Sequence, residues 1–518
     1  MQKFYITTAI DYVNGAPHIG HAYEKIATDV IARQHKQLGE EVYFLTGSDE
    51  HGIKIQKTAA SQGVTPQELC DSNVSKFKET WKLLEVDYDK YIRTTDPEHK
   101  SAVQKIFKKL VENGAIYKDS YTGLYCSGCE CFLNEKDLTE GGLCPDHLNK
   151  PDEVKEENYF FKLSAYKDQL KEYIKTSVKP EYRVNEVLNQ LEDIRDISVS
   201  RSSENLQWGI PVPDDDSQII YVWIDALSNY ITALGYDTEN PSEVFKKNWP
   251  ADCHMIGKDI LKFHAIYWPA ILIALDVELP KTIFAHGWIT VDEQKMGKSL
   301  GNVISPASLM EAFLLEKPDA LRYFFMTTTP FGRDGNYSDE DFKAKVNAEL
   351  ANSMGNLLNR SLSMLCKYFD GEIKPEFVSE TLKNSALNAL DKTAKAFENY
   401  HLDQGAEAII ELVNEVNKYV NDNAPWTLAK EEKWQECGEA LYNVLETMRF
   451  VAVLIYPFCP NIAQDIWSQL SCEGNVADIK YSDLAWGGLK IGKIATLETV
   501  KPVFLRLDSE FAGDKKKK

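Results

Sequence analysis

Two histidines near the start of the chain are spaced for contact with a phosphate group. His18 and His21 lie one helical turn apart, with Gly20 between them. Residues 3–8 (KFYITT) predict a buried strand, and residues 21–38 predict a helix. The histidines would then lie at a helix N-terminus, where unpaired N–H groups favour phosphate and the glycine leaves room for a nucleotide. Alone, this run is equally compatible with an ordinary helix start that carries two solvated histidines.

A second run with suitable chemistry lies far downstream. Lys295 and Lys298 are three residues apart in the polar, glycine-containing segment 295–299 (KMGKS). Lysine places a compact charge on a flexible stem, so two lysines in one loop suit a mobile clamp on a polyphosphate. In isolation, the segment is better explained as an exposed basic loop. Only together with the histidine pair does it indicate a phosphate-binding function.

Four residues have the spacing of zinc ligands. Cys126, Cys129, Cys144 and His147 form two hooks, C-x-x-C and C-x-x-H. Each hook offers two ligands, and two hooks complete the tetrahedron of a closed, structural zinc site. We therefore predict one structural Zn²⁺ per chain. Cys131 could replace His147 as the fourth ligand, but the symmetry of the hooks favours His147.

The elements that must position these residues predict an α/β fold with a parallel sheet, followed by a helical bundle. Strand-like and helical stretches alternate up to about residue 115, as in parallel β–α units that bind ligands at the carboxyl ends of their strands. Residues 116–215 look like an insertion, and residues 221–225 (YVWID) predict the strand at which the parallel sheet resumes. Beyond residue 338 the pattern is almost wholly helical.

Composition is that of a large globular protein. The chain has 518 residues, of which 43% are hydrophobic and 26% charged, and it has room for several domains. It carries no secretory pattern, and its best apolar run, residues 266–275, is too short to span a bilayer. Ten cysteines without a signal favour reduced thiols, so we expect a cytoplasmic protein without membrane contact. The formal net charge of −21 argues against bulk affinity for nucleic acid, although a local basic face can still bind RNA.

Together, the histidine and lysine runs resemble the two signatures of class I aminoacyl-tRNA synthetases in their order and separation. Further runs are similar to those of the methionyl-tRNA synthetases: 7–15 (TTAIDYVNG), 47–52 (GSDEHG), 221–226 (YVWIDA), 257–268 (GKDILKFHAIYW) and 424–426 (APW). The resemblance extends from about residue 3 to residue 470. The chain departs from the family at Gly297, where serine is more usual, and at Leu227, where some relatives have proline.

The resemblance implies a ligase that activates methionine with ATP to methionyl-adenylate and pyrophosphate, and then transfers methionine to tRNA(Met). The expected partners are therefore ATP, which enters with Mg²⁺, L-methionine and tRNA(Met). The zinc site would be the knuckle that this family carries in its insertion. We expect a monomer, because the C-terminal module through which some relatives dimerise does not follow the bundle here.

The resemblance also assigns residues to each ligand. ATP would be bound by His18, Gly20, His21, Asp259, Gly287, Lys295, Lys298 and Ser299, among which the two histidines and the two lysines would act in catalysis. Methionine would be bound by Ile10, Tyr12, Asp49, Trp223, Ala226, Tyr230, Ile260, His264 and Trp268, with Asp49 accepting from the α-ammonium group. The tRNA anticodon would be read by Asn356, Arg360 and Trp426. Without the resemblance, each aromatic residue here is better explained as part of the core.

The expected domains follow from the same comparison. They are a first Rossmann-type catalytic half at 1–115, a connective insertion with the zinc knuckle at 116–215, a second catalytic half at 216–284, the lysine loop and stem-contact region at 285–338, a helical anticodon-binding domain at 339–485, and a C-terminal extension with a lysine tail at 486–518.

Other functions fit less well. Isoleucyl, leucyl and valyl enzymes carry a much larger editing insertion, and a cysteinyl enzyme would need a zinc ion with an open position for its substrate. A tRNA-binding scaffold without activity would not need the histidine and lysine runs. A small adenylyltransferase could share the histidine run but not the helical bundle.

Overall fold

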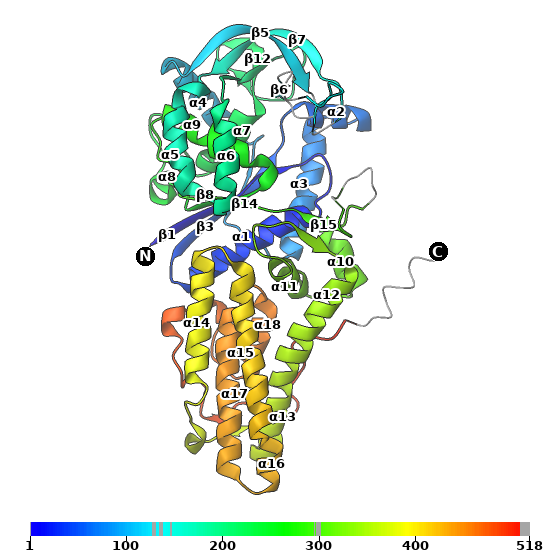
Figure 1. The fold of residues 1–518 in the computed structure, drawn as a ribbon, viewed down its shortest axis with the longest axis vertical. Helices are drawn as coiled ribbons and strands as arrows, with labels where there is room; N and C mark the ends of the chain where they lie inside the picture. Colours follow the sequence, from blue (N-terminus) through cyan, green and yellow to red (C-terminus); the bar gives the residue numbers. More distant parts are fainter. Residues whose placement is uncertain are drawn as a thin grey trace, which may run out of the picture.

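The computed structural model describes residues 2–126, 131–133, 138–145, 148–294, 296 and 302–507. The molecule is elongated, with its sheets at one end and a bundle of long helices at the other (Figure 1). The predicted fold class, a parallel α/β sheet followed by a helical bundle, is confirmed. No helix among the described residues is both long and apolar enough to cross a membrane.

The central sheet is parallel and has the strand order β2-β3-β1-β13-β14-β8. A further strand, β4, also pairs with β3. Its strands are β1 (Lys3–Thr8), β2 (Asp11–Tyr12), β3 (Glu41–Asp49), β4 (Lys90–Arg93), β8 (Val178–Lys179), β13 (Cys253–Gly257) and β14 (Ile283–His286). Because every pairing is parallel, the carboxyl ends of these strands meet at one edge, where ligands bind in such sheets.

Helices cover both faces of this sheet. The helices of this part of the chain are α1 (Ile19–Gln37), which packs against β1, β3 and β13, α2 (Ile53–Gln62), α3 (Pro66–Leu83), α4 (Pro97–Glu112), α7 (Val222–Thr232), α8 (Glu243–Asn248) and α9 (Trp268–Ala274). The predicted strand at 3–8 is confirmed, and α1 begins two residues before the predicted start at residue 21.

The prediction that residues 221–225 resume the parallel sheet is wrong. Val222–Thr232 forms the helix α7, and the sheet resumes at β13 (Cys253–Gly257). Most of α7 is buried, including its first residues, Val222 and Ile224, which make the start of the segment an apolar run. A short apolar run does not distinguish a buried helix from a buried strand, which explains the error.

The segment predicted as an insertion, 116–215, contains strands that could not be recognised from its polar sequence. An antiparallel sheet is formed by β5 (Ile116–Cys126), β6 (Cys131–Leu133), β7 (Asp152–Phe161) and β9 (Ile197–Ser198), and a second by β10 (Ser200–Ser202), β11 (Pro211–Val212) and β12 (Asp215–Ile220). The helices α5 (Lys167–Ser177) and α6 (Val184–Glu192) also belong to this segment, and β8 returns from it to the edge of the parallel sheet.

Two short helices, α10 (Pro306–Ala312) and α11 (Asp319–Thr327), and the strand pair β15 (Ile289–Val291) and β16 (Gly335–Tyr337) lead into the bundle. The bundle consists of α12 (Asp339–Val346), a π-helical stretch (Asn347–Gly355), α13 (Asn356–Phe369), α14 (Lys383–Glu398), α15 (Leu402–Asn423), α16 (Pro425–Lys430), α17 (Trp434–Ile455) and α18 (Pro460–Gln469). The last strand, β18 (Gly492–Lys493), pairs with β17 (Glu372–Ile373), so the C-terminal segment packs back on the bundle.

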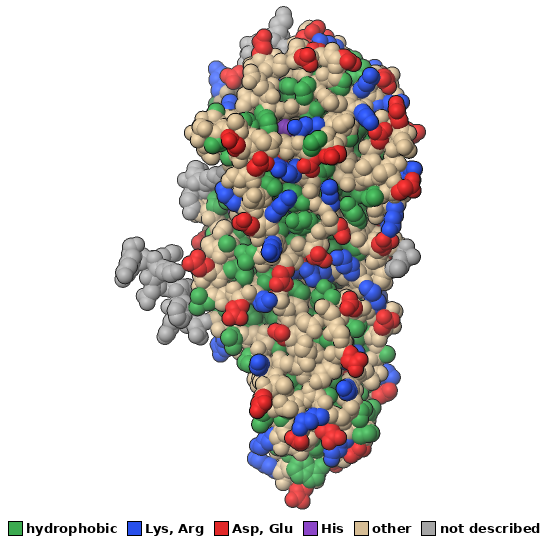
Figure 2. Space-filling model, turned by 180° about the vertical axis from the view of Figure 1, so that it is seen from behind, with side chains coloured by type: hydrophobic (Ala, Val, Ile, Leu, Met, Phe, Trp, Pro, Cys, Tyr) green, Lys and Arg blue, Asp and Glu red, His purple; other side chains and the backbone are tan. Residues whose placement is uncertain are grey.

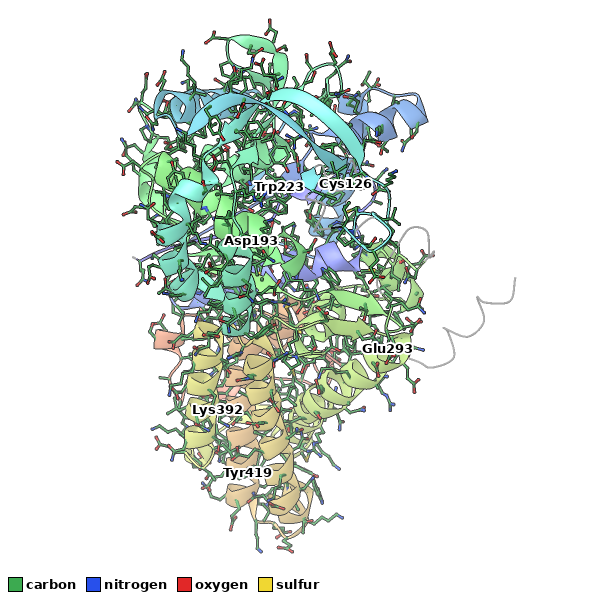
Figure 3. The ribbon with its side chains drawn as sticks, turned by 45° about the horizontal axis from the view of Figure 1, so that its top comes forward. Cys126, Asp193, Trp223, Glu293, Lys392 and Tyr419 are labelled. Carbon is green, nitrogen blue, oxygen red and sulfur yellow. The ribbon has the colours of Figure 1, made fainter. Side chains whose placement is uncertain are left out.

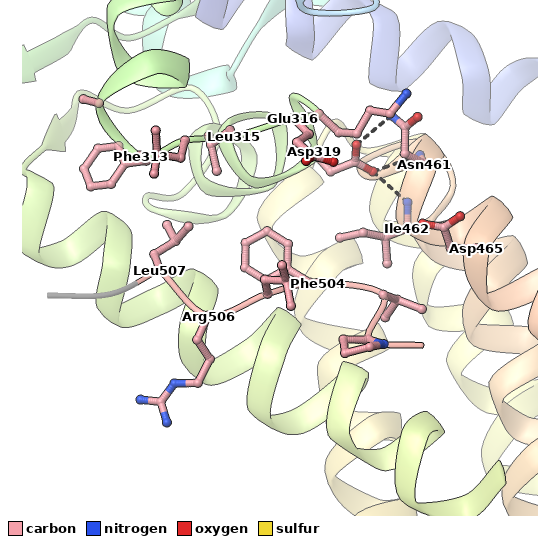
Figure 4. A pocket seen from close by; sticks show the side chains of 16 residues that line it. Phe313, Leu315, Glu316, Asp319, Asn461, Ile462, Asp465, Phe504, Arg506 and Leu507 are labelled. Carbon is pink, nitrogen blue, oxygen red and sulfur yellow. Dashed lines mark hydrogen bonds between the residues drawn. The ribbon is translucent and has the colours of Figure 1, made fainter. Parts of the chain in front are cut away.

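A cavity of about 420 Å³ lies where residues 312–319, the start of α18 and residues 502–507 meet (Figure 4). Its wall includes the carboxylate of Asp319, which accepts hydrogen bonds from the backbone N–H groups of Asn461 (2.9 Å) and Ile462 (3.0 Å). Asp319 thereby caps the first turn of α18. No predicted site residue lines this cavity.

A buried ion pair joins the catalytic half to the bundle. Arg322 in α11 is fully buried, and its guanidinium donates to Asp29 Oδ2 in α1 at 2.6 Å. It also donates to the carbonyl oxygens of Leu84, Pro457 and Phe458. Burial raises the pKa of Asp29, but Arg33 and Arg322 outweigh burial and hold it below its ordinary value.

We predict that Arg322→Met lowers the free energy of unfolding by about 3 kcal/mol, because it removes one partner of a buried pair and leaves carbonyl groups without donors. Urea unfolding followed by circular dichroism measures the change. Lys392→Met is the matched control, because Lys392 pairs with Glu411 at 2.9 Å on the surface, where a pair contributes less than about 1 kcal/mol. Equal effects of the two substitutions would contradict the role given to Arg322.

Candidate active site

The two histidines of the first run close the N-terminus of α1. His18 is the N-cap residue, and its Nδ1 accepts from the backbone N–H of Gly20 at 3.1 Å. His21 Nδ1 in turn accepts from the backbone N–H of His18 at 3.2 Å. The ring centroids are 3.9 Å apart. Since Nδ1 is the acceptor in both neutral rings, each carries its proton on Nε2, from which it can donate to a phosphate.

Gly20 lies at a tightly packed place in this turn. A Cβ at residue 20 would lie 2.9 Å from His18 Cε1 and 3.3 Å from Met296 Cε. On the far side of the lysine run, the carbonyl of Ile304 accepts from the backbone N–H of Ile19 at 3.0 Å. The chain therefore meets the start of α1 both at Met296 and at Ile304. Lys295, Gly297, Lys298 and Ser299 lie outside the described residues.

A cavity of about 400 Å³ opens next to this helix start, at the carboxyl ends of β1 and β3. Eight of the nine residues predicted to bind methionine line it: Ile10, Tyr12, Asp49, Trp223, Ala226, Tyr230, Ile260 and His264. Its wall also includes Asn14, four residues before His18, and Asp259. Trp223 lies in the half of the molecule that holds the sheets, well away from Lys392 and Tyr419 in the bundle (Figure 3).

Trp268 is the exception among the nine. It is fully buried, its indole N–H donates to His254 Nε2 at 3.2 Å, and its ring centroid lies 5.9 Å from that of Tyr230. Trp268 therefore supports the cavity wall from behind and does not line it.

The polar groups of the inner wall bond to one another. His264 Nδ1 donates to the carbonyl of Ile260 at 3.0 Å, which leaves Nε2 to accept from the Tyr230 hydroxyl at 2.7 Å. Burial lowers the pKa of His264 to about 4, so the ring is neutral near pH 7. Trp223 stacks on Phe263, with centroids 3.7 Å apart. Such a wall offers aromatic surface and a satisfied hydroxyl, which suits a thioether better than a charged or strongly polar side chain.

Asp49 ends β3 and lines the cavity. It is not the N-cap residue of the following helix, because that position of α2 is held by Gly52. A carboxylate that lines the cavity is suited to accept hydrogen bonds from an ammonium group.

Two residues predicted on the adenosine side lie near β13 and β14. Asp259 lines the cavity, and its Oδ1 accepts from the Trp288 indole N–H at 3.2 Å. Gly287 directly follows β14, and a Cβ there would lie 2.2 Å from the carbonyl carbon and oxygen of Arg333. Glycine is therefore required at residue 287 by the close approach of the backbone at Arg333.

A buried charge network beneath the site was not predicted from the sequence. Lys25 Nζ donates to Asp11 Oδ1 and Glu24 Oε1, both at 2.9 Å, and to the carbonyl of Ala9 at 3.0 Å. The other oxygen of Glu24 lies 3.0 Å from His286 Nε2. Burial raises the pKa of Asp11 to about 7 although Lys25 opposes it, whereas Lys25 and His286 hold the pKa of Glu24 below its ordinary value despite burial. The sequence offered one sign of this network: the charged residues Glu24 and Lys25 are adjacent on the helix that begins at the two histidines.

The residues predicted to read an anticodon lie in the bundle. Asn356 and Arg360 are one turn apart on α13, where Asn356 is exposed and Arg360 donates to Asn417 Oδ1 at 2.9 Å. Trp426 lies in the first turn of α16, at the far end of the bundle (Figure 1), and its side chain is 37% exposed. Trp426 is thus available for stacking and is not a core residue.

Two of the four predicted zinc ligands are described, and they approach the same residue. Cys126 Sγ lies 3.4 Å from Asn149 Oδ1, and the backbone N–H of Cys144 donates to the carbonyl of Asn149 at 2.9 Å. Both cysteines are fully buried. Cys129 and His147 lie outside the described residues.

Comparisons with known proteins agree on one family. The model of the class I (M) tRNA synthetases matches residues 4–151 and 147–362, and that of the anticodon-binding domain of tRNA ligases matches residues 382–493. The chain is 47% identical to the methionine–tRNA ligase of Clostridium perfringens, over 97% of this chain and 80% of the relative, and 44% identical to the chloroplastic/mitochondrial enzyme of Arabidopsis thaliana, over 100% and 85%. A solved structure of Mycobacterium tuberculosis methionyl-tRNA synthetase in complex with methionyl-adenylate superimposes with a TM-score of 0.91 at 38% identity, over 98% of this chain and 100% of that one.

Proposed function

The chain belongs to the class I tRNA synthetases as a methionine–tRNA ligase, and on this basis we propose which of its residues carry each step of the reaction. The enzyme activates methionine with ATP and transfers the amino acid to tRNA. One observation carries the assignment of residues: the aromatic cavity ends at Asn14, four residues before the histidine that begins α1.

Methionine occupies the cavity of about 400 Å³. Its thioether lies against Tyr230, His264 and Trp223, and its α-ammonium group donates to Asp49. Sulfur–aromatic contacts of this kind contribute about 0.3–1.5 kcal/mol each, so selectivity comes from shape and from several such contacts together. Ile10, Tyr12, Ala226 and Ile260 complete the walls, and Trp268 supports them.

Adenylate formation needs no protein nucleophile. The methionine carboxylate attacks the α-phosphate of ATP, which enters as its magnesium complex, and the bond to pyrophosphate breaks. The work of the protein is to position the reactants and to stabilise phosphate charge. His18 and His21 donate from Nε2 at the N-terminus of α1, and Lys295, Lys298 and Ser299 approach from the other side.

The adenosine half of ATP lies toward β13 and β14. Asp259 accepts from the nucleotide at the edge of the cavity. Gly20 and Gly287 let the backbone come close, because a side chain at either residue would collide with neighbouring protein atoms. The support for these roles is the position of both glycines at the carboxyl edge of the sheet.

Transfer to tRNA uses the far end of the molecule for recognition. The exposed ring of Trp426 stacks on a splayed-out anticodon base, and Asn356 and Arg360 contact the neighbouring bases from α13. Acidic and basic side chains are interspersed over the face shown in Figure 2, so the net charge of −21 leaves local positive charge available for RNA.

A structural zinc ion is the remaining component of the proposal. Its support is that Cys126 and Cys144 are both buried and both contact Asn149, Cys126 through its Sγ and Cys144 through its backbone N–H; Cys129 and His147 would complete the site. Zinc bound there would hold the two hooks of the insertion together. The division into domains at 1–115, 116–215, 216–284, 285–338, 339–485 and 486–518 is part of the same proposal.

We also propose a cytoplasmic monomer. None of the eight cysteines whose side chains the structure describes forms a disulfide, which is compatible with a reducing compartment. Sedimentation equilibrium showing a stable dimer would contradict the monomer.

We predict that His21→Ala and Lys298→Ala each slow methionyl-adenylate formation at least tenfold, which corresponds to about 1.4 kcal/mol of barrier. Methionine-dependent ATP–pyrophosphate exchange measures the effect. Lys392→Ala, on the bundle surface, is the control and should leave exchange unchanged. Exchange that depends on another amino acid and not on methionine would refute the proposed function, and normal exchange in both variants would refute only the phosphate roles.

Substitution of two tryptophans should separate tRNA recognition from methionine activation. Trp426→Ala should weaken tRNA binding by about 1–3 kcal/mol, the scale of base–aromatic stacking, while exchange without tRNA is preserved. Trp223→Ala should instead weaken the use of methionine in exchange. The comparison requires melting curves close to that of the parent protein, and equal losses of exchange and aminoacylation in Trp426→Ala would contradict the anticodon role.

Zinc content tests the two hooks. We expect one zinc ion per chain by metal analysis, and we expect Cys144→Ala to lose it and to expose the insertion to protease, because metal binding and local folding are coupled. Cys459→Ala is the control, since Cys459 is a buried thiol near Asp319 in the bundle. Full zinc retention in Cys144→Ala would exclude Cys144 as a ligand.

A further inference from the structure

We propose that His51, Asp225 and His99 form a positioning unit that sets the shape of the methionine cavity, an inference that rests on the function proposed above. None of the three side chains lines the cavity. Their exposed fractions are 3%, 1% and 2%, and the reaction described above uses none of them. Two directional hydrogen bonds nevertheless join them to one another, and their elements carry the walls that hold Tyr12, Asp49 and Trp223.

Asp225 is the centre of the unit. It lies in the first turn of α7, between Trp223 and Ala226, which both line the cavity. Its Oδ2 accepts from His51 Nδ1 at 2.6 Å, and its Oδ1 accepts from His99 Nε2 at 2.8 Å. Each carboxylate oxygen therefore has a histidine donor from a different element, and burial does not leave the charge unpaired.

His51 connects this helix to two further walls. It follows Asp49, the last residue of β3, by two positions. Its carbonyl accepts from the hydroxyl of Tyr12 at 3.2 Å. The walls that carry Tyr12, Asp49 and Trp223 thus meet at one histidine.

His99 fixes the other end of α7. While Nε2 donates to Asp225, Nδ1 lies 2.7 Å from the hydroxyl of Thr232, the last residue of the helix. From α4, one imidazole therefore holds both the first turn and the last residue of α7, which fixes the helix along its own axis.

The hydrogen bonds of Asp225 fix the orientation of α7, which apolar contacts alone would not do. An apolar helix face can slide or rotate on its neighbours at small cost, whereas charge-assisted hydrogen bonds are short and directional. Each residue of an α-helix points in its own direction, about 100° from the next. A rotation of α7 about its axis would therefore turn Trp223 away from the cavity. Losing either bond would also leave a buried charge with one partner fewer, which is costly.

A pair of substitutions at residue 51 tests the unit. Asparagine carries an amide N–H close to the place of the imidazole Nδ1–H, and leucine has a similar volume without a donor. We expect His51→Leu to raise the KM for methionine in ATP–pyrophosphate exchange about tenfold, the scale of one hydrogen bond to a charged group, with kcat within about threefold and the KM for ATP unchanged. We expect His51→Asn to restore the KM for methionine to within about threefold of the parent value.

His35→Leu is the matched control. His35 also donates from Nδ1 to a carboxylate, that of Glu40, at 2.6 Å, but it lies at the opposite end of α1 from the site. This variant should leave the KM for methionine unchanged. If His51→Leu does not fold, Asp225→Asn provides the same test. It preserves the shape of the side chain but replaces one of the two carboxylate acceptors with an amide donor.

The outcomes separate this inference from the proposed function. If Trp223→Ala raises the KM for methionine and folded His51→Leu and Asp225→Asn do not, the cavity is the methionine site and the positioning unit is refuted. The unit is also refuted if His51→Asn is as impaired as His51→Leu, or if kcat falls and the KM for methionine stays constant. If Trp223→Ala leaves the KM unchanged as well, the assignment of the cavity fails.

Discussion

Helix α1 passes through the interior with charged side chains on it, and each of these charges must be paired there. Glu24, Lys25, Asp29 and Arg33 are all buried. A buried ion without its partner costs several kcal/mol, whereas a complete pair is close to neutral for stability. The pairs therefore contribute little net free energy and instead restrict where α1 can lie.

Each pair holds α1 against a different part of the molecule. Lys25 with Asp11 fixes it to β2, whose other residue, Tyr12, lines the methionine cavity, and Glu24 with His286 fixes it to the end of β14 on the nucleotide side. Asp29 with Arg322 fixes it to α11, and Arg322 also donates to the carbonyl oxygens of Pro457 and Phe458, between α17 and α18 of the bundle whose far end carries Trp426. The N-terminus of the same helix presents His18 and His21. One helix thereby relates the phosphate, methionine and anticodon ends of the enzyme to one another.

The sequence was sufficient for the histidine run, the strand before it and the helical bundle, because these depend on local spacing and on periodicity along a single element. It also selected eight of the residues that line the cavity, through resemblance and not through pattern. It failed where the answer depends on tertiary packing. The apolar segment 221–225 is a buried helix, and the strands β5 and β7 are too polar to be recognised alone. Trp268 has the right chemistry but lies behind the wall. The pairs that Glu24 makes with His286 and Asp225 makes with His51 and His99 join residues far apart in the chain.

The central claim is that the cavity beside α1 holds methionine while the start of α1 holds the phosphates. A crystal structure of the enzyme with methionine and a non-reactive ATP analogue measures this directly. The account predicts density for the thioether between Tyr230 and His264, the ammonium group within hydrogen-bonding distance of Asp49, and phosphate oxygens in reach of Nε2 of His18 and His21. Methionine bound outside this cavity, or phosphates bound away from the start of α1, would contradict it.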